Sequence, residues 1–116
     1  MTILPSQIYS LIEVKEGDTA RILYDTLSLA GQAIPLTNAT VSLWWWNPDE
    51  NTRTEKSATI VSATSGSVSY QLTSDDVAEP GVRLLEWSVT FQNGSVLRVP
   101  TGKYIKLNII GDLVDE

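Results

Sequence analysis

The sequence predicts an all-β fold, an antiparallel sandwich of seven or eight short strands. Three observations support this prediction. Short apolar segments are separated by turn sequences at the spacing typical of sandwiches. Two segments, 67–72 and 82–91, alternate between apolar and polar residues with the period of a half-buried strand. No segment keeps the 3.6-residue period of an amphipathic helix.

The chain has 116 residues, of which 42% are hydrophobic and 19% charged, a composition typical of one globular domain. We expect a single domain over 1–116. Residues 1–10 are expected to be an N-terminal arm and residues 111–116 an acidic C-terminal tail.

The first third of the chain contains two predicted strands. Residues 8–14 are expected to form a first strand at a sheet edge, and residues 19–29 a long second strand. Asp25 falls on the more apolar face of the second strand, a position that suggests a β-bulge nearby. Residues 30–35 then make a turn and a short extended approach to the next strand.

The next predicted strand, within 36–48, is unusually rich in tryptophan. One of its faces carries Val41, Leu43 and Trp45, and the other carries Ser42, Trp44 and Trp46. The second face thus begins polar and ends in two indoles. Trp44 and Trp46 either pack under a loop of the same chain or form a contact patch that another molecule covers.

Five further strands are predicted, at 52–62, 67–72, 82–91, 96–99 and 104–110. Asn93-Gly94 favours the positive φ angles of a two-residue hairpin loop. Thr73 and Asp76 have the spacing of a helix cap, and Pro80-Gly81 follows closely. We therefore expect a single helical turn at 74–78.

The composition excludes several kinds of function. The absence of cysteine excludes disulfides and thiolate chemistry, and the absence of histidine removes the usual general base and the commonest metal ligand. A net charge of -6 argues against a nucleic-acid surface, and no apolar run approaches the ~20 residues of a membrane helix. The N-terminal residues lack signal-peptide features, so we expect assembly in a cytoplasm.

Asp75, Asp76 and Glu79 form an acidic cluster beside the Pro80-Gly81 turn. Their oxygens are of the kind that calcium prefers, but the ligand spacing of a calcium loop is absent. We therefore interpret them as solvated residues that cap the helical turn. No pair of carboxylates is placed across a cleft by the sequence, so we expect no enzyme activity, no catalytic residue, no metal site and no cofactor.

A series of turn and strand sequences runs through the chain in a fixed order. The segments are Gly17-Asp18-Thr19, Leu36-Thr37-Asn38-Ala39-Thr40-Val41, Ser65-Gly66-Ser67-Val68-Ser69-Tyr70, Pro80-Gly81 and Asn93-Gly94. This order resembles the immunoglobulin-like domain found at the N-terminus of baseplate upper proteins of tailed bacteriophages, and as small phage structural proteins. Asn38 stands where the family usually has glycine, and Trp44-Trp45-Trp46 is richer in aromatic residues than the family pattern.

The resemblance implies an immunoglobulin-like sandwich in a virion protein that has no catalytic activity. Such a protein would be assembled in the host cytoplasm, in many copies, and would bind other phage structural proteins. The tail, baseplate or neck is the expected position, because family members are best known at the tail tip. Decoration of the major capsid protein on the head shell is the alternative. Copy number, direct partner and host stay open.

We expect the docking surface to contain Trp44 and Trp46 with Asn47, Pro48 and Arg53 of the loop that follows them. The arm or the tail is expected to become ordered on assembly by adding a strand to a neighbour. A carbohydrate-binding or adhesion module is the competing function, because exposed tryptophans on sandwiches stack on sugars. A hydrolase would require a cleft lined with carboxylates.

Overall fold

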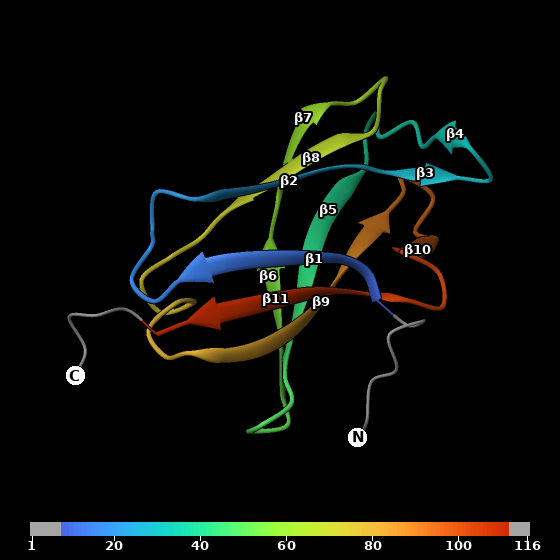
Figure 1. The fold of residues 1–116 in the computed structure, drawn as a ribbon. Helices are drawn as coiled ribbons and strands as arrows, with labels where there is room; N and C mark the ends of the chain where they lie inside the picture. Colours follow the sequence, from blue (N-terminus) through green and yellow to red (C-terminus); the bar gives the residue numbers. More distant parts are fainter. Residues whose placement is uncertain (1–7, 112–116) are drawn as a thin grey trace.

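The computed structural model describes residues 8–111, and this part of the chain is built from strands and turns (Figure 1). The strands are β1 (Ile8–Lys15), β2 (Ile22–Thr26), β3 (Ser28–Leu29), β4 (Gln32–Ala33), β5 (Thr40–Asn47), β6 (Thr52–Ser57), β7 (Thr59–Ser62), β8 (Ser67–Gln71), β9 (Gly81–Thr90), β10 (Val96–Val99) and β11 (Tyr104–Ile110). The all-β prediction is therefore confirmed. The described range contains no helix with the length and hydropathy needed to cross a bilayer.

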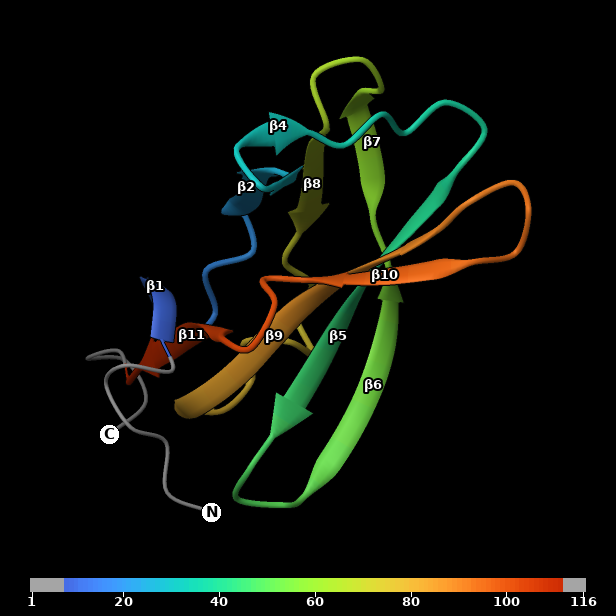
Figure 2. The ribbon, with the colours of Figure 1, turned by 90° about the vertical axis from the view of Figure 1, so that its right-hand side faces the viewer.

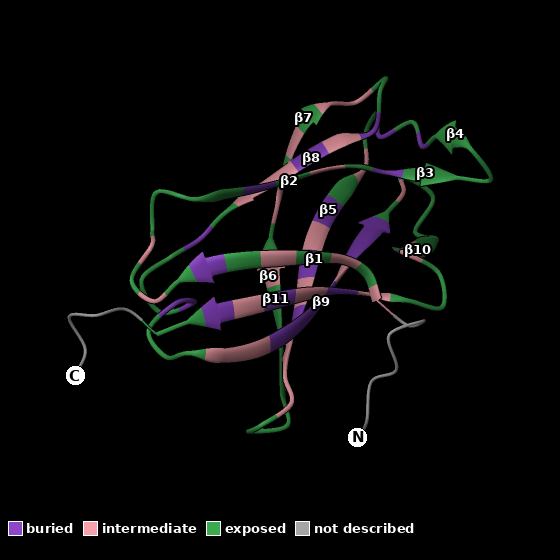
Figure 3. Ribbon diagram, in the orientation of Figure 1, coloured by how far each residue is buried: buried purple, intermediate pink, exposed green. Residues whose placement is uncertain are grey.

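Two main sheets form the sandwich. The larger has the order β1-β11-β9-β5-β6, with β10 also paired to β9, and the smaller has the order β2-β8-β7. Buried side chains from both sheets form one core cluster, which the burial colouring of Figure 3 marks on β5, β8, β9 and β11. β3 and β4 make a separate two-stranded hairpin. Figure 2 shows the β5–β6 hairpin extending beyond the smaller sheet.

One pairing departs from the expected antiparallel arrangement. β1 lies at an edge of the larger sheet, as predicted, but it runs parallel to β11. The other pairings between described strands are antiparallel.

The structure has more strands than the seven or eight expected, because two predicted strands are divided and the short β4 forms within the segment 30–35. The segment 19–29 becomes β2 and β3, which are separated by the buried Leu27. The segment 52–62 becomes β6 and β7, which are separated by Ala58. β6 pairs with β5 in the larger sheet and β7 with β8 in the smaller one, so the chain changes sheets at Ala58.

Asp25 faces the core without the bulge that its position suggested. The β2–β8 register is continuous from Ile22 to Thr26. The carboxylate is accommodated instead by a hydrogen bond, because the fully buried Trp87 donates its indole N–H to Asp25 Oδ2 at 3.0 Å. A paired acceptor lowers the cost of placing a carboxylate against the core.

Two turns differ from those predicted, and the backbone conformation of a third explains a departure from the family pattern. The predicted helical turn at 74–78 is a hydrogen-bonded turn over 74–77 without a helix. The β9–β10 loop comprises residues 91–95, whereas a two-residue loop was expected. Within this loop only Gly94 has a positive φ (91°). Asn93 instead accepts hydrogen bonds through its side-chain oxygen from the N–H and the hydroxyl of Ser95. Asn38 has a φ of 61°, a conformation that asparagine tolerates, which explains why it can replace the glycine of the family pattern.

The predicted arm and tail fall mostly outside the described residues. β1 begins at Ile8, within the range expected for the arm, whereas 1–7 and 112–116 are not described.

Candidate docking surface

The alternation of β5 separates its tryptophans onto opposite faces of the larger sheet. Val41, Leu43 and Trp45 are at most 6% exposed and belong to the core between the sheets. Trp44 and Trp46 are half-buried and lie on the opposite, outward face. This placement agrees with the alternation predicted from the sequence.

Neighbouring strands complete a patch around the two indoles. Trp46 lies directly opposite Arg53 of β6 and Leu84 of β9. Trp44 lies directly opposite two glutamates, Glu55 of β6 and Glu86 of β9. Residues opposite each other in antiparallel strands share a face, so all of these side chains point outward. Leu84 is nevertheless only 3% exposed, because the larger side chains around it cover it.

Two arginines lie over the two indoles. The Arg53 guanidinium carbon is 4.7 Å from the ring centroid of Trp46, and that of Arg98 is 5.9 Å from the ring centroid of Trp44. Both distances allow cation–π attraction. Asn51 Oδ1 accepts hydrogen bonds from Trp46 Nε1 and from Arg53 Nη1, each at 3.3 Å, and so fixes this pair in place. The Trp44 indole N–H is buried without an acceptor.

Together these side chains line an open groove of about 380 Å³, which also includes Tyr104 at the start of β11. Aromatic and arginine side chains are the residue types that most often anchor interfaces. The groove therefore has the composition of a docking surface.

The structure brings together three of the five residues predicted for this surface. Trp44, Trp46 and Arg53 line the groove. Asn47 instead organises the β5–β6 turn: its Oδ1 accepts hydrogen bonds from the backbone N–H groups of Asp49 (3.0 Å) and Glu50 (3.4 Å). Pro48, next to Asn47 in the chain, is half-buried and does not line the groove.

Six residues that line the groove were not predicted as part of the surface: the core residues Trp45 and Leu85, and Leu84, Glu86, Arg98 and Tyr104. Leu84 carried a signal in the sequence, because it is an apolar residue on the otherwise polar face of its strand. Arg98 and Tyr104 belong to distant segments, and only strand pairing places them beside the tryptophans.

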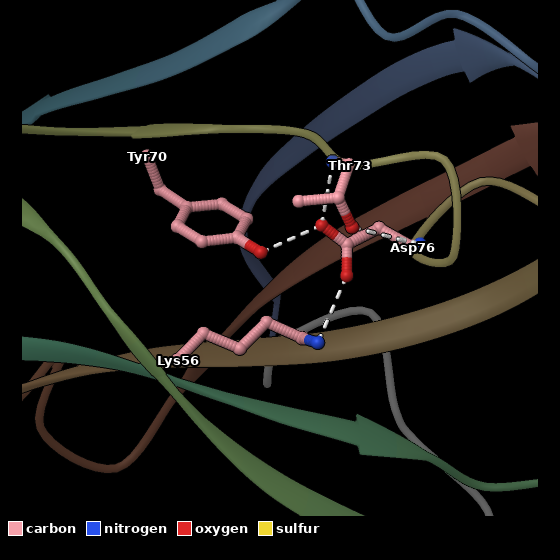
Figure 4. Close-up of polar contacts among 4 residues, drawn as sticks. All are labelled: Lys56, Tyr70, Thr73 and Asp76. Atoms are coloured by element: carbon pink, nitrogen blue, oxygen red, sulfur yellow. Dashed lines mark hydrogen bonds and ion pairs between the residues drawn. The ribbon is translucent and has the colours of Figure 1, made fainter.

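A second cluster of polar side chains is buried between the sheets (Figure 4). Asp76 Oδ1 pairs with Lys56 Nζ at 2.8 Å, and Asp76 Oδ2 accepts hydrogen bonds from Tyr70 Oη at 2.6 Å and from the Thr73 N–H at 2.9 Å. The Asp76 N–H donates in return to Thr73 Oγ1 at 3.3 Å. The predicted cap between Thr73 and Asp76 is thus formed, but Asp76 is only 5% exposed rather than solvated.

These contacts shift two pKa values. Burial raises the pKa of the Asp76 carboxyl, but the hydrogen bonds from Lys56, Tyr70 and Thr73 outweigh burial and hold it below 3.8. Burial, reinforced by the hydrogen bond to Asp76, raises the pKa of Tyr70 well above its usual value. The Asp76 carboxylate and the Tyr70 hydroxyl are hydrogen-bonded to each other, so we interpret this cluster as one that stabilises the fold. Within residues 8–111 no group of three or more acidic side chains is placed to hold a metal ion.

Comparisons with known structures identify proteins that share this fold. No protein-family model and no curated protein sequence matches the chain. The N-terminal domain of phage TP901-1 ORF48 matches with a TM-score of 0.67 at 12% sequence identity, over 87% of this chain and 85% of that chain. CopC from Methylosinus trichosporium OB3b matches with a TM-score of 0.53 at 7% identity, over 88% of this chain and 85% of that chain. The chain therefore has the fold of a phage protein's N-terminal domain, as its sequence resemblance predicted.

Proposed function

We propose that this protein is a non-catalytic structural component of a phage virion that docks onto another virion subunit through the groove around Trp44 and Trp46. The observation that carries the proposal is the pair of half-buried indoles on the outward face, on a domain that resembles phage structural domains in both sequence order and fold. Fold alone does not determine function, and CopC shares this architecture, so the groove carries the functional argument.

In the proposed mechanism the domain is a rigid spacer that binds its neighbour through the groove on the outward face of the larger sheet. The core holds β5 and β9 in place, and their outward side chains meet the neighbouring subunit. Covering two indoles and their stacked arginines removes apolar area from water, which favours association. Because virion proteins act in many copies, each contact needs only modest affinity.

The tail, baseplate or neck is the position we propose, because the phage family that the sequence order resembles is best known at the tail tip and baseplate. Decoration of the head shell is the alternative position. A carbohydrate-binding module is the alternative function, because Trp44 and Tyr104 beside Glu86 would also suit a sugar ring and its hydroxyls.

Replacing Trp44 and Trp46 together by serine tests the proposal. The double variant should remain folded and be lost from purified phage particles, because the indoles lie outside the core. Tyr24→Ser is the matched control: Tyr24 is an aromatic residue 67% exposed on the smaller sheet, and its variant should be incorporated normally.

Three results would contradict the proposal. The first is normal incorporation of the double serine variant. The second is its unfolding, which would make the indoles core residues. The third is sugar binding on a glycan array that depends on Trp44 and Trp46 without binding to virion subunits, which would favour the carbohydrate alternative.

A further inference from the structure

We infer that the groove receives an extended polypeptide segment of the partner that carries two carboxylates on one face, one meeting Arg53 and the other Arg98. This inference rests on the proposed function and specifies the chemistry of the partner. Three properties of the groove support it: its local charge, its unused hydrogen-bond donors and the position of its two arginines over two indoles of one strand.

The groove is basic in a protein that is acidic as a whole. The net charge of the chain is -6, yet the groove is lined by two arginines and a single glutamate, Glu86. Beside the lining on the same face, the charges of Glu55, opposite Trp44, and Lys106, opposite Leu84, offset one another. The ion pairs of the described residues involve Arg21 with Asp18 and Lys56 with Asp76. Arg53 and Arg98 thus have no carboxylate partner within the part of the chain that the structure describes. Charge complementarity at an interface then favours an acidic partner.

The donors of the groove outnumber its acceptors. Arg53 uses one N–H group on Asn51, and no hydrogen bond from the Arg98 side chain occurs among the described residues. The Trp44 indole N–H is buried without an acceptor, which is unfavourable until a partner supplies one. A partner rich in carboxylate and carbonyl oxygens supplies what these groups lack. Arginine also binds carboxylates through paired, charge-assisted hydrogen bonds.

The position of the arginines over two residues of one strand favours an extended segment. Trp44 and Trp46 are two residues apart on one face of β5, so their Cα atoms are roughly 7 Å apart. One guanidinium lies over each ring. Side chains at positions i and i+2 of an extended segment also point to the same side. A segment in β conformation with acidic residues on one face therefore presents its carboxylates to the face on which one arginine lies over each indole.

Other ligand classes fit the groove less well. A neutral glycan would leave both guanidinium groups without a counter-charge. A nucleic acid would be repelled by the negative net charge of the protein and by Glu86, which lines the groove.

The test compares incorporation of arginine variants into phage particles. Arg53→Gln with Arg98→Gln removes the charge, and Arg53→Lys with Arg98→Lys retains it. We expect the glutamine variant to be depleted about tenfold in particles and the lysine variant to be depleted much less. Arg21→Gln is the control, because Arg21 is an exposed arginine away from the groove that pairs with Asp18. Carbodiimide treatment of particles that carry the lysine variant should couple positions 53 and 98 to aspartate or glutamate residues of another virion protein.

The outcomes separate the inference from the proposed function. If the Trp44→Ser/Trp46→Ser variant is excluded while the glutamine variant is incorporated normally, the docking surface stands and the acidic partner is refuted. If the serine variant is also incorporated normally, both fail. Equal loss of the glutamine and lysine variants would also refute the inference, because positive charge would not be what the partner recognises. Circular dichroism of each variant verifies that loss of incorporation is not loss of folding.

Discussion

Lys56 and Asp76 form an ion pair of 2.8 Å that joins the edge strand of the larger sheet to the turn after β8 of the smaller sheet. The Asp76 side chain has no exposed surface and that of Lys56 is 21% exposed. Tyr70 and Thr73 donate to the same carboxylate. Since β6 and β7 belong to different sheets, this cluster holds the two layers together next to the segment where the chain passes between them.

Removing the Asp76 carboxylate should strongly destabilise the fold. Asp76→Ala leaves Lys56, Tyr70 and the Thr73 N–H without their acceptor, and we expect a loss of about 3–5 kcal/mol in the free energy of unfolding. Asp75→Ala is the control, because Asp75 is exposed, and it should change stability by no more than about 0.5 kcal/mol. Urea denaturation measures both. Equal effects of the two substitutions would show that the cluster does not join the sheets.

The Asp76 carboxylate should also make the free energy of unfolding depend on pH in the acidic range. The pKa of Asp76 is lower in the folded protein than the usual 3.8, so its contribution is fully present above that value and is lost as the pH falls through the folded pKa. The stability of the wild-type protein should therefore fall more steeply below pH ~4 than that of Asp76→Asn. Urea unfolding between neutral and acidic pH measures the two slopes, and parallel curves would contradict the assignment.

The hydrogen bond between Trp87 and Asp25 explains a carboxylate placed against the core, and it gives a third prediction. Asp25→Ala should cost about 1–3 kcal/mol, because it leaves a buried indole N–H without an acceptor. Asp25→Asn retains an acceptor oxygen and should cost less. The fluorescence of the protein should report the change around Trp87. Equal losses for alanine and asparagine would contradict this prediction, because they would show that the negative charge, which both variants lack, matters rather than the acceptor oxygen.

Gly66 should be irreplaceable, whereas Gly94 should tolerate substitution. Both have positive φ, at 75° and 91°. A Cβ on Gly66 would lie 2.6 Å from the carbonyl oxygen of Leu27, while one on Gly94 would meet no atom within 4 Å. We expect Gly94→Ala to cost about 1–2 kcal/mol through its backbone conformation alone, and Gly66→Ala clearly more. Thermal or urea unfolding of the two variants tests the difference, and similar values would contradict it.

Several features of the fold follow from local sequence. The alternation in 40–47 and 81–90 predicts both the strands and which faces are buried, because side chains in a strand point alternately to its two faces. Local signals also identified the cap between Thr73 and Asp76. They failed at Ala58, where an uninterrupted polar strand pattern gives no sign that the chain leaves one sheet for the other.

The sequence by itself determined the all-β class, the faces of β5 and the presence of two indoles beyond what the core requires. The tertiary structure alone decided that Arg98 and Tyr104 join those indoles, that Asn47 does not, and that Asp76 is buried beside Lys56. The reason is physical: alternation along a strand is a local property of the backbone, whereas the neighbours of a side chain across a sheet are set by pairing between segments far apart in the chain.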